Sequence, residues 1–341
     1  MSDQVSEIVD RVLVRIRDGS LPNDEVEVPG APRGVFTSVD SAMDAAAQAQ
    51  LTLNAQPLEK RREIIANIRK RTASDVHKLA RLAVDETGLG RYEDKIKKNL
   101  LVIHKSPGPE ILEPIAYTGD DGLTLIERAP FGVIGSITPC TNPTETIINN
   151  GIGMVSAGNT VVFNTHPAAK GVSAYCIDLI NKASIEVGGP ENIMTCVESP
   201  TIASANEVMT HKTTALVAVT GGGAVVKAAM NSGKKCVAAG PGNPPVVVDE
   251  TADIDLAGRG IVRGASFDNN VICTDEKEVF VVEKVADKLV ETMIDEGAVL
   301  LRNHQITRLE KLILTADREH INRDWVGQNA SKMLREIAVP F

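Results

Sequence analysis

The sequence has few aromatic residues and contains no long apolar run. Its 341 residues include one tryptophan, three tyrosines and six phenylalanines. A protein that stacks nucleic-acid bases would need more rings, and the net charge of −9 opposes binding to a phosphate backbone. No run of about 18 apolar residues occurs, as a membrane-spanning helix would require. We therefore expect neither nucleic acid nor a membrane as a partner.

Cysteine and histidine are also sparse, and neither shows a pattern typical of cross-links or metal ligands. The five cysteines are odd in number and include no Cys-x-x-Cys pair. The six histidines are scattered without a ligand spacing such as His-Glu-x-x-His. We expect free thiols in a reducing cytoplasm, no disulfide framework and no metal site.

The first segment, residues 1–18, has the apolar spacing of an amphipathic helix. Charged residues interrupt it, which is not typical of a secretory leader. Residues 19–37 contain several prolines, glycines and acids and are predicted to be an extended linker. A tethered helix of this kind either docks on another protein or packs on its own domain or a sister subunit. The apolar stripe consists of Val5, Ile8, Val9, Val12, Leu13 and Ile16.

The rest of the chain predicts an α/β fold with a doubly wound parallel sheet. Helices are expected first, over 39–51, 58–86 and 92–105, followed by a hairpin near 115–127. From Phe131 to about residue 245, continuous apolar strands alternate regularly with helices, which is typical of a buried parallel sheet. We expect a nucleotide-binding domain over 38–245 and a second α/β unit over 246–341.

Parallel sheets bind ligands at the carboxyl ends of their strands, and three loops lie there. They are Thr138–Pro143, Asn164–Pro167 and Thr220–Gly223. The glycine run in the third loop either receives a phosphate on its backbone N–H groups or makes a tight turn, and its spacing does not decide between them.

A cysteine nucleophile must be accessible and easily ionised. Cys176, Cys196 and Cys236 lie in apolar patterns and are predicted to be core residues. Cys140 precedes a helix N-terminus, and Cys273 lies in a polar loop rich in amides. Local chemistry leaves the choice between Cys140 and Cys273 open, as well as the alternative that neither is catalytic.

Several motifs together resemble the aldehyde dehydrogenase superfamily, from about residue 39 to residue 325. They are Ala-Pro-Phe-Gly-Val-Ile-Gly at 129–135, Thr-Pro followed by Asn-Pro-Thr-Glu-Thr at 138–146, Phe-Asn-Thr-His-Pro-Ala-Ala-Lys at 163–170, and the loop of Cys273. The His-Pro at 166–167 is similar to the CoA-acylating branch, the propionaldehyde and acetaldehyde enzymes of bacterial microcompartments.

The resemblance implies an oxidation in two half-reactions. Cys273 would be the nucleophile, and the Asn142 side chain would stabilise the oxyanion. The family's hydrolytic members carry a glutamate base where this sequence has Ala238, so CoA is expected to receive the acyl group in place of water. Oxidation of a short aliphatic aldehyde to acyl-CoA is the implied activity.

The resemblance also implies NAD as cofactor and CoA as co-substrate, using overlapping space in turn. Thr138 and Pro139 would flank the nicotinamide half, and Gly221 and Gly222 would approach the pyrophosphate. The adenosine side would be lined by Thr165, His166 and Pro167.

The family further implies a homo-oligomer in a cytoplasmic microcompartment, with residues 5–16 docking on a shell protein. Family members continue well past residue 325, so the second domain is expected to be truncated at its C-terminus. Two alternative hypotheses for the function are a hydrolytic aldehyde dehydrogenase and a non-catalytic interaction module.

Overall fold

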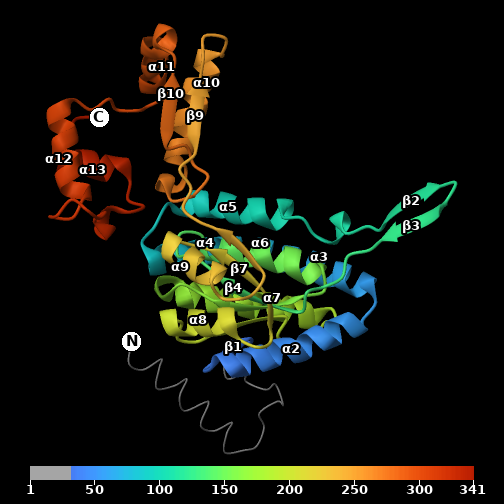
Figure 1. The fold of residues 1–341 in the computed structure, drawn as a ribbon. Coiled ribbons are helices and arrows are strands. Elements are labelled where there is room, and N and C mark those ends of the chain that lie inside the picture. Colours follow the sequence, from blue (N-terminus) through green and yellow to red (C-terminus); the bar gives the residue numbers. More distant parts are fainter. Residues whose placement is uncertain (1–31) are drawn as a thin grey trace, which may run out of the picture. The chain divides into compact units, whose positions relative to one another are not determined.

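The computed structural model describes residues 32–341, of which Arg33–Phe341 form one unit. Figure 1 shows its helices and strands. The helix predicted over 1–18 and most of the linker predicted over 19–37 lie outside the described residues.

A six-stranded parallel sheet forms the centre of this unit, in the order β1-β6-β5-β4-β7-β8. β4 and β5 are buried at every position, as their uninterrupted apolar sequences predict. The predicted doubly wound α/β class is confirmed. The strands are β1 (Val35–Phe36), β4 (Val133–Ile137), β5 (Thr160–Asn164), β6 (Met194–Val197), β7 (Thr214–Thr220) and β8 (Cys236–Ala239).

Helices cover both faces of this sheet. Val161 and Phe163 of β5 join one apolar cluster with residues of α3, α6 and α7, while Val162 between them joins a second cluster with α2, α8 and α9. This alternation follows from the two-residue period of a strand. The helices are α2 (Val39–Ala55), α3 (Leu58–Ser74), α4 (Val76–Thr87), α5 (Tyr92–Lys105), α6 (Pro143–Ser156), α7 (Lys170–Glu186), α8 (Ile202–Thr210) and α9 (Gly223–Met230).

Two expectations from the sequence were wrong in detail. The single helix predicted over 58–86 is divided into α3 and α4 at Asp75, whose backbone leaves helical geometry and whose carboxylate accepts the Tyr175 hydroxyl of α7. Val35 and Phe36, placed in the linker, pair in parallel with β6 as an edge strand. Tertiary partners decide both cases, and a local pattern does not contain them.

Residues beyond β8 build a smaller α/β arrangement. β9 (Pro245–Val248) and β10 (Glu278–Val281) pair in parallel, and α10 (Ile254–Ser266) and α11 (Glu283–Asp295) pack against them. Two further helices, α12 (Asn303–Ile313) and α13 (Ala330–Glu336), follow in regions where the sequence analysis assigned no element. The domain boundary at 245/246 stays a prediction.

Short 3₁₀ turns lie at η1 (Pro109–Ile111), η2 (Pro167–Ala169), η3 (Phe267–Asn270) and η4 (Arg323–Trp325).

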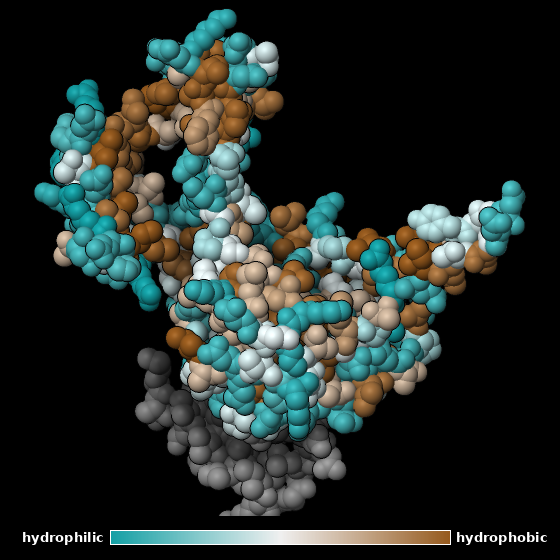
Figure 2. Space-filling view, viewed as in Figure 1, coloured by the Kyte–Doolittle hydropathy of each residue, from teal (hydrophilic) through white to brown (hydrophobic). Residues whose placement is uncertain are grey.

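The predicted hairpin is present as β2 (Ile115–Gly119) and β3 (Gly122–Ile126), paired antiparallel. All ten of its strand residues are exposed, and apolar side chains gather on it (Figure 2). Among residues 32–341, no helix combines the length and apolar character needed to cross a bilayer.

Candidate functional site

The strand order reverses direction between β4 and β7. From β4 the chain adds β5 and β6 on one side, and it then returns to add β7 and β8 on the other. A crevice opens at such a switch point outside the carboxyl ends of the strands. The loops after β4 and β7 therefore border the expected ligand site.

A cavity of about 470 Å³ lies at this edge and is lined by loops that follow β4, β5 and β7. All seven residues predicted to bind the cofactor line it. They are Thr138, Pro139, Thr165, His166, Pro167, Gly221 and Gly222.

Two features of the cavity fit a dinucleotide. The Thr138 side chain is buried, and its hydroxyl has no hydrogen-bond partner among the described residues, so a polar ligand would satisfy it. The N-terminus of α9 has no side-chain cap, and a Cβ placed on Gly222 would meet no atom within 4 Å. The open backbone there offers N–H groups to a pyrophosphate.

His166 presents a defined edge to the cavity. Its Nδ1 accepts a hydrogen bond of 3.1 Å from the backbone N–H of Ala168. Burial, assisted by the positive charge of Arg323, lowers the pKa of His166 below its ordinary value. The ring is thus neutral with its proton on Nε2, which is a donor for a ligand oxygen.

A second cavity of about 290 Å³ contains Cys273 and Asn142. It shares Pro139, Gly221 and Gly222 with the first, so the two cavities adjoin along the glycine loop. The structure therefore brings the two predicted catalytic residues into one cavity, next to the predicted nucleotide site.

The loop before Cys273 has an unusual backbone. Asp268, Asn269 and Asn270 all have positive φ, at 44°, 55° and 59°. Non-glycine residues rarely adopt this conformation, and a series of three persists only when side chains hold it. Asn269 donates to the Gly327 carbonyl and Asn270 to the Ala265 carbonyl, at 2.8 and 2.7 Å. The surrounding structure thus fixes this loop.

The five cysteines differ sharply in exposure, and Cys273 alone is exposed. Burial raises the pKa of Cys140 and of Cys236, raises that of Cys196 to about 12 and raises that of Cys176 further. Cys140 lines the first cavity and not the second. Of the two candidates that the sequence left open, Cys273 is the more accessible thiol, and its role as the nucleophile stays a prediction.

Sequence reasoning missed a buried ionic cluster beside this cavity. Lys95 and Lys98 of α5 each have a side chain exposed by 6% or less, and both contact the carboxylate of Asp268, at 3.1 and 2.5 Å. Their spacing of three residues places them on one helix face, which a charged helix ordinarily turns to solvent. Here that face packs against the loops of Asn142 and Asp268.

Ala238 lies elsewhere. It lines a further cavity with Phe131 and Asn159, and does not line the Cys273 cavity. Its segment carries no carboxylate, so no general base from β8 reaches Cys273.

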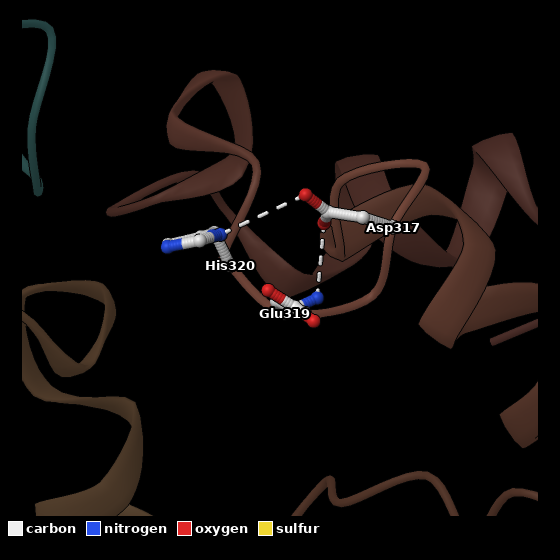
Figure 3. A group of neighbouring side chains, drawn as sticks. All are labelled: Asp317, Glu319 and His320. Carbon is white, nitrogen blue, oxygen red and sulfur yellow. Dashed lines mark hydrogen bonds and ion pairs between the residues drawn. The ribbon is translucent and has the colours of Figure 1, made fainter.

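Asp317, Glu319 and His320 lie close together (Figure 3), and their possible metal-ligand atoms are all within 4.8 Å of one another. All three are exposed, and the Asp317 carboxylate accepts hydrogen bonds from Thr315 and from the Glu319 backbone. These contacts are those of a tight turn, and they give no reason to assign a metal.

The fold and these adjoining cavities define a parallel-sheet protein with a dinucleotide-type crevice and an accessible cysteine beside it. The model of the aldehyde dehydrogenase family matches residues 20–311. The chain belongs to the aldehyde dehydrogenase family, and the resemblance predicted from the sequence is confirmed.

The acetylating acetaldehyde dehydrogenase EutE of Salmonella typhimurium is 45% identical over 340 residues, 98% of this chain and 72% of that protein. The CoA-propanoylating propanal dehydrogenase of the same organism is 44% identical over 310 residues, 90% of this chain and 66% of that protein.

Solved structures agree with these relatives. A propionaldehyde dehydrogenase from the fucose utilisation microcompartment of Clostridium phytofermentans superposes with a TM-score of 0.87 at 46% identity, over 91% of this chain and 71% of that one. The Rhodopseudomonas palustris propionaldehyde dehydrogenase with bound CoA and an acylated cysteine superposes with a TM-score of 0.87 at 44% identity. The match covers 90% of this chain and 71% of that one.

Proposed function

We propose that the protein oxidises a short aliphatic aldehyde to its acyl-CoA thioester with NAD⁺. The observation that carries the proposal is the shared cavity of Cys273 and Asn142, which adjoins the glycine rim of the nucleotide cavity. The acylating relatives described above support the same chemistry. Overall, aldehyde, CoA and NAD⁺ give acyl-CoA, NADH and a proton.

In the first half-reaction the Cys273 thiolate adds to the aldehyde carbonyl, and the carbonyl oxygen becomes an oxyanion. Asn142 lines the same cavity and has an amide N–H that can donate to this oxygen. One such donor is worth about 3 kcal/mol in the transition state. The loops that line the first cavity would hold NAD⁺, which would supply the hydride acceptor, and an acyl thioester would remain on Cys273.

In the second half-reaction the thiolate of CoA attacks this thioester and releases Cys273. A positioned base would accelerate attack by water about 10²- to 10⁴-fold, and the β8 segment that supplies one in hydrolytic relatives carries Ala238. A thiol needs less help, since its ordinary pKa is about 8.5 and its thiolate is a strong nucleophile. The chain's residues therefore favour transfer to CoA over hydrolysis.

The test is NADH formation from propionaldehyde with and without CoA, together with chromatography of the products. We expect CoA-dependent turnover and propionyl-CoA as product, and no turnover in the Cys273→Ala variant. Carboxylate formed at full rate without CoA would show a hydrolytic enzyme instead. NADH formation retained by Cys273→Ala but lost in Cys140→Ala would move the nucleophile to Cys140.

We further propose that the protein is a homo-oligomer inside a bacterial microcompartment and that residues 5–16 dock on a shell protein. The relatives from microcompartments support the location, and the apolar stripe of Val5, Ile8, Val9, Val12, Leu13 and Ile16 supports the docking. A fluorescent protein fused to residues 1–18 should enter co-expressed microcompartments. Replacing Leu13 and Ile16 by aspartate should leave that fusion diffuse, and equal entry of both fusions would contradict the docking.

A further inference from the structure

Lys98 of α5 makes a direct contact with the proposed oxyanion donor. Its Nζ donates to the side-chain oxygen Oδ1 of Asn142 over 2.5 Å. The same Nζ lies 2.5 Å from Oδ2 of Asp268 and 3.7 Å from Oε1 of Glu145. Its side chain is 6% exposed, so water competes little for these contacts.

The contact decides which way the Asn142 carboxamide faces. An ammonium group only donates, so the amide oxygen must face Lys98 and the NH₂ group must face away. One of its N–H bonds is directed at Thr141 Oγ1, 3.1 Å away. The other is left for a ligand in the cavity that Asn142 shares with Cys273. A flipped amide would place its oxygen toward the developing oxyanion and repel it.

The charges around Lys98 favour the donating form. Burial alone lowers the pKa of Lys98, but the carboxylates of Glu145 and Asp268 outweigh burial, and the net direction is upward. Both carboxylates lie against Lys98, whereas burial lowers the pKa of the neighbouring Lys95, so the positive charge of this cluster is held best at Lys98. One hydrogen bond and two ion pairs thus hold the buried ammonium group of Lys98 beside the Asn142 carboxamide.

Asp268 extends the same cluster to the loop of the nucleophile. It lies five residues before Cys273, and its Oδ1 accepts the backbone N–H of Arg91 over 2.7 Å. Lys95 contacts its Oδ2 and also donates to the Thr141 carbonyl over 2.6 Å. Through Asp268 and Thr141, Lys95 therefore links the Cys273 loop to the Asn142 loop, and this link does not involve Lys98.

We propose that Lys98 is a positioning residue of the reaction: it orients the Asn142 carboxamide so that the NH₂ group faces the oxyanion formed at Cys273. This inference rests on the proposed function. Lys98 acts through Asn142, so its contribution should vanish once the Asn142 side chain is removed.

A double-mutant cycle tests this dependence. Wild type, Lys98→Met, Asn142→Ala and the double variant are compared for NADH formation with propionaldehyde and CoA. Loss of an oxyanion donor costs about 10²- to 10³-fold in kcat, and a misdirected donor should cost about 10- to 100-fold. We expect Lys98→Met to lower kcat by that factor, with KM for NAD⁺ within about twofold, since the nucleotide cavity is not lined by Lys98. The double variant should be no slower than Asn142→Ala alone.

Lys97→Met is the matched control on the same helix. Lys97 carries the same charge, but its side chain is 66% exposed and pairs with Asp94. We expect its turnover to stay within about twofold of wild type, because exposed pairs contribute little. The alkylation rate of Cys273 by iodoacetamide, measured in each variant, reports whether the nucleophile loop is intact, and it should be unchanged in Lys98→Met.

Lys98→Gln provides a second variant in case methionine leaves the carboxylates unbalanced and the protein unfolds. A glutamine amide both donates and accepts, so it permits either orientation of Asn142, and intermediate turnover is expected. Multiplicative losses in the double variant, or unchanged turnover in Lys98→Met, would overturn the inference. Unfolding of both Lys98 variants would also overturn it, since Lys98 would then serve stability. A wild-type protein without CoA-dependent turnover would instead contradict the proposed function.

Discussion

The backbone of Gly242 lies directly against that of Cys273. A Cβ added at Gly242 would sit 2.0 Å from the Cys273 carbonyl oxygen and 2.9 Å from its carbonyl carbon. Backbone atoms cannot yield as a flexible side chain can, so any other residue at 242 must displace the loop of Cys273. Only a glycine at position 242 allows the Cys273 loop to keep its observed position.

We predict that Gly242→Ala lowers kcat by about 100-fold, because a displacement of about 1 Å at a reacting group costs this much. The protein should remain folded, since the clash is confined to the two loops that carry Gly242 and Cys273. Steady-state NADH formation and circular dichroism check the two statements.

Gly260→Ala is the control for that substitution. Gly260 lies within α10, where an added Cβ would meet nothing within 4 Å. Alanine is the better helix former by about 0.5–1 kcal/mol, so this variant should be fully active and slightly more stable. Equal activity of both glycine variants would show that the contact at Gly242 is unimportant.

We predict that one equivalent of iodoacetamide at pH 8 labels Cys273 and leaves the other four thiols largely unmodified. Cys273 is exposed, whereas burial raises the pKa of Cys140, Cys176, Cys196 and Cys236 and keeps them protonated. Peptide mass spectrometry identifies the labelled site. If Cys140 were labelled before Cys273, the cavity that Cys140 lines would be more accessible than the structure describes.

The sequence predicted the sheet well because the apolar run that indicates a buried strand lies within the strand itself. The continuous apolar strands at 160–164 and 133–137 are buried at every position, and the capping pattern at Pro143 places the start of α6. The same reasoning led to the three loops that were predicted to bind ligands, since the ends of the strands can be predicted from the sequence, and all three line one cavity.

The ionic cluster under the site was not predictable in this way. Lys95 is paired with Asp268, which lies more than 170 positions further along the chain, and no local pattern indicates that contact. A lysine pair on a charged helix is ordinarily solvated, and the carboxylate that reverses this expectation comes from the loop after α10. The division of the 58–86 helix at Asp75 has the same origin, a hydroxyl donated by Tyr175 on α7.

We predict opposite effects of Thr138→Val on stability and on nucleotide binding. The Thr138 hydroxyl is buried without a hydrogen-bond partner, and an unsatisfied group of this kind costs about 1–3 kcal/mol. Valine has nearly the same shape, so the free protein should unfold at a higher temperature. Its affinity for NAD⁺ should fall if the hydroxyl binds the nucleotide. Thermal unfolding and fluorescence titration measure the two, and an unchanged affinity would remove Thr138 from the binding site.

We predict that the imidazole of His166 titrates below the ordinary value of about 6.5. Burial lowers the pKa of His166, the charge of Arg323 lowers it further, and Nδ1 can accept from the Ala168 N–H only while it is unprotonated. A lowered pKa means that the unfolded chain takes up this proton first as the pH falls. The contribution of His166 to stability is therefore present above about pH 6.5 and lost as the pH falls below it. The ring proton resonances, assigned with a His166→Gln variant and followed from pH 8 to 5, give the midpoint directly. A midpoint above 6.5 would mean that the cavity favours the charged ring over the neutral one, which contradicts a hydrogen bond accepted by Nδ1 from Ala168.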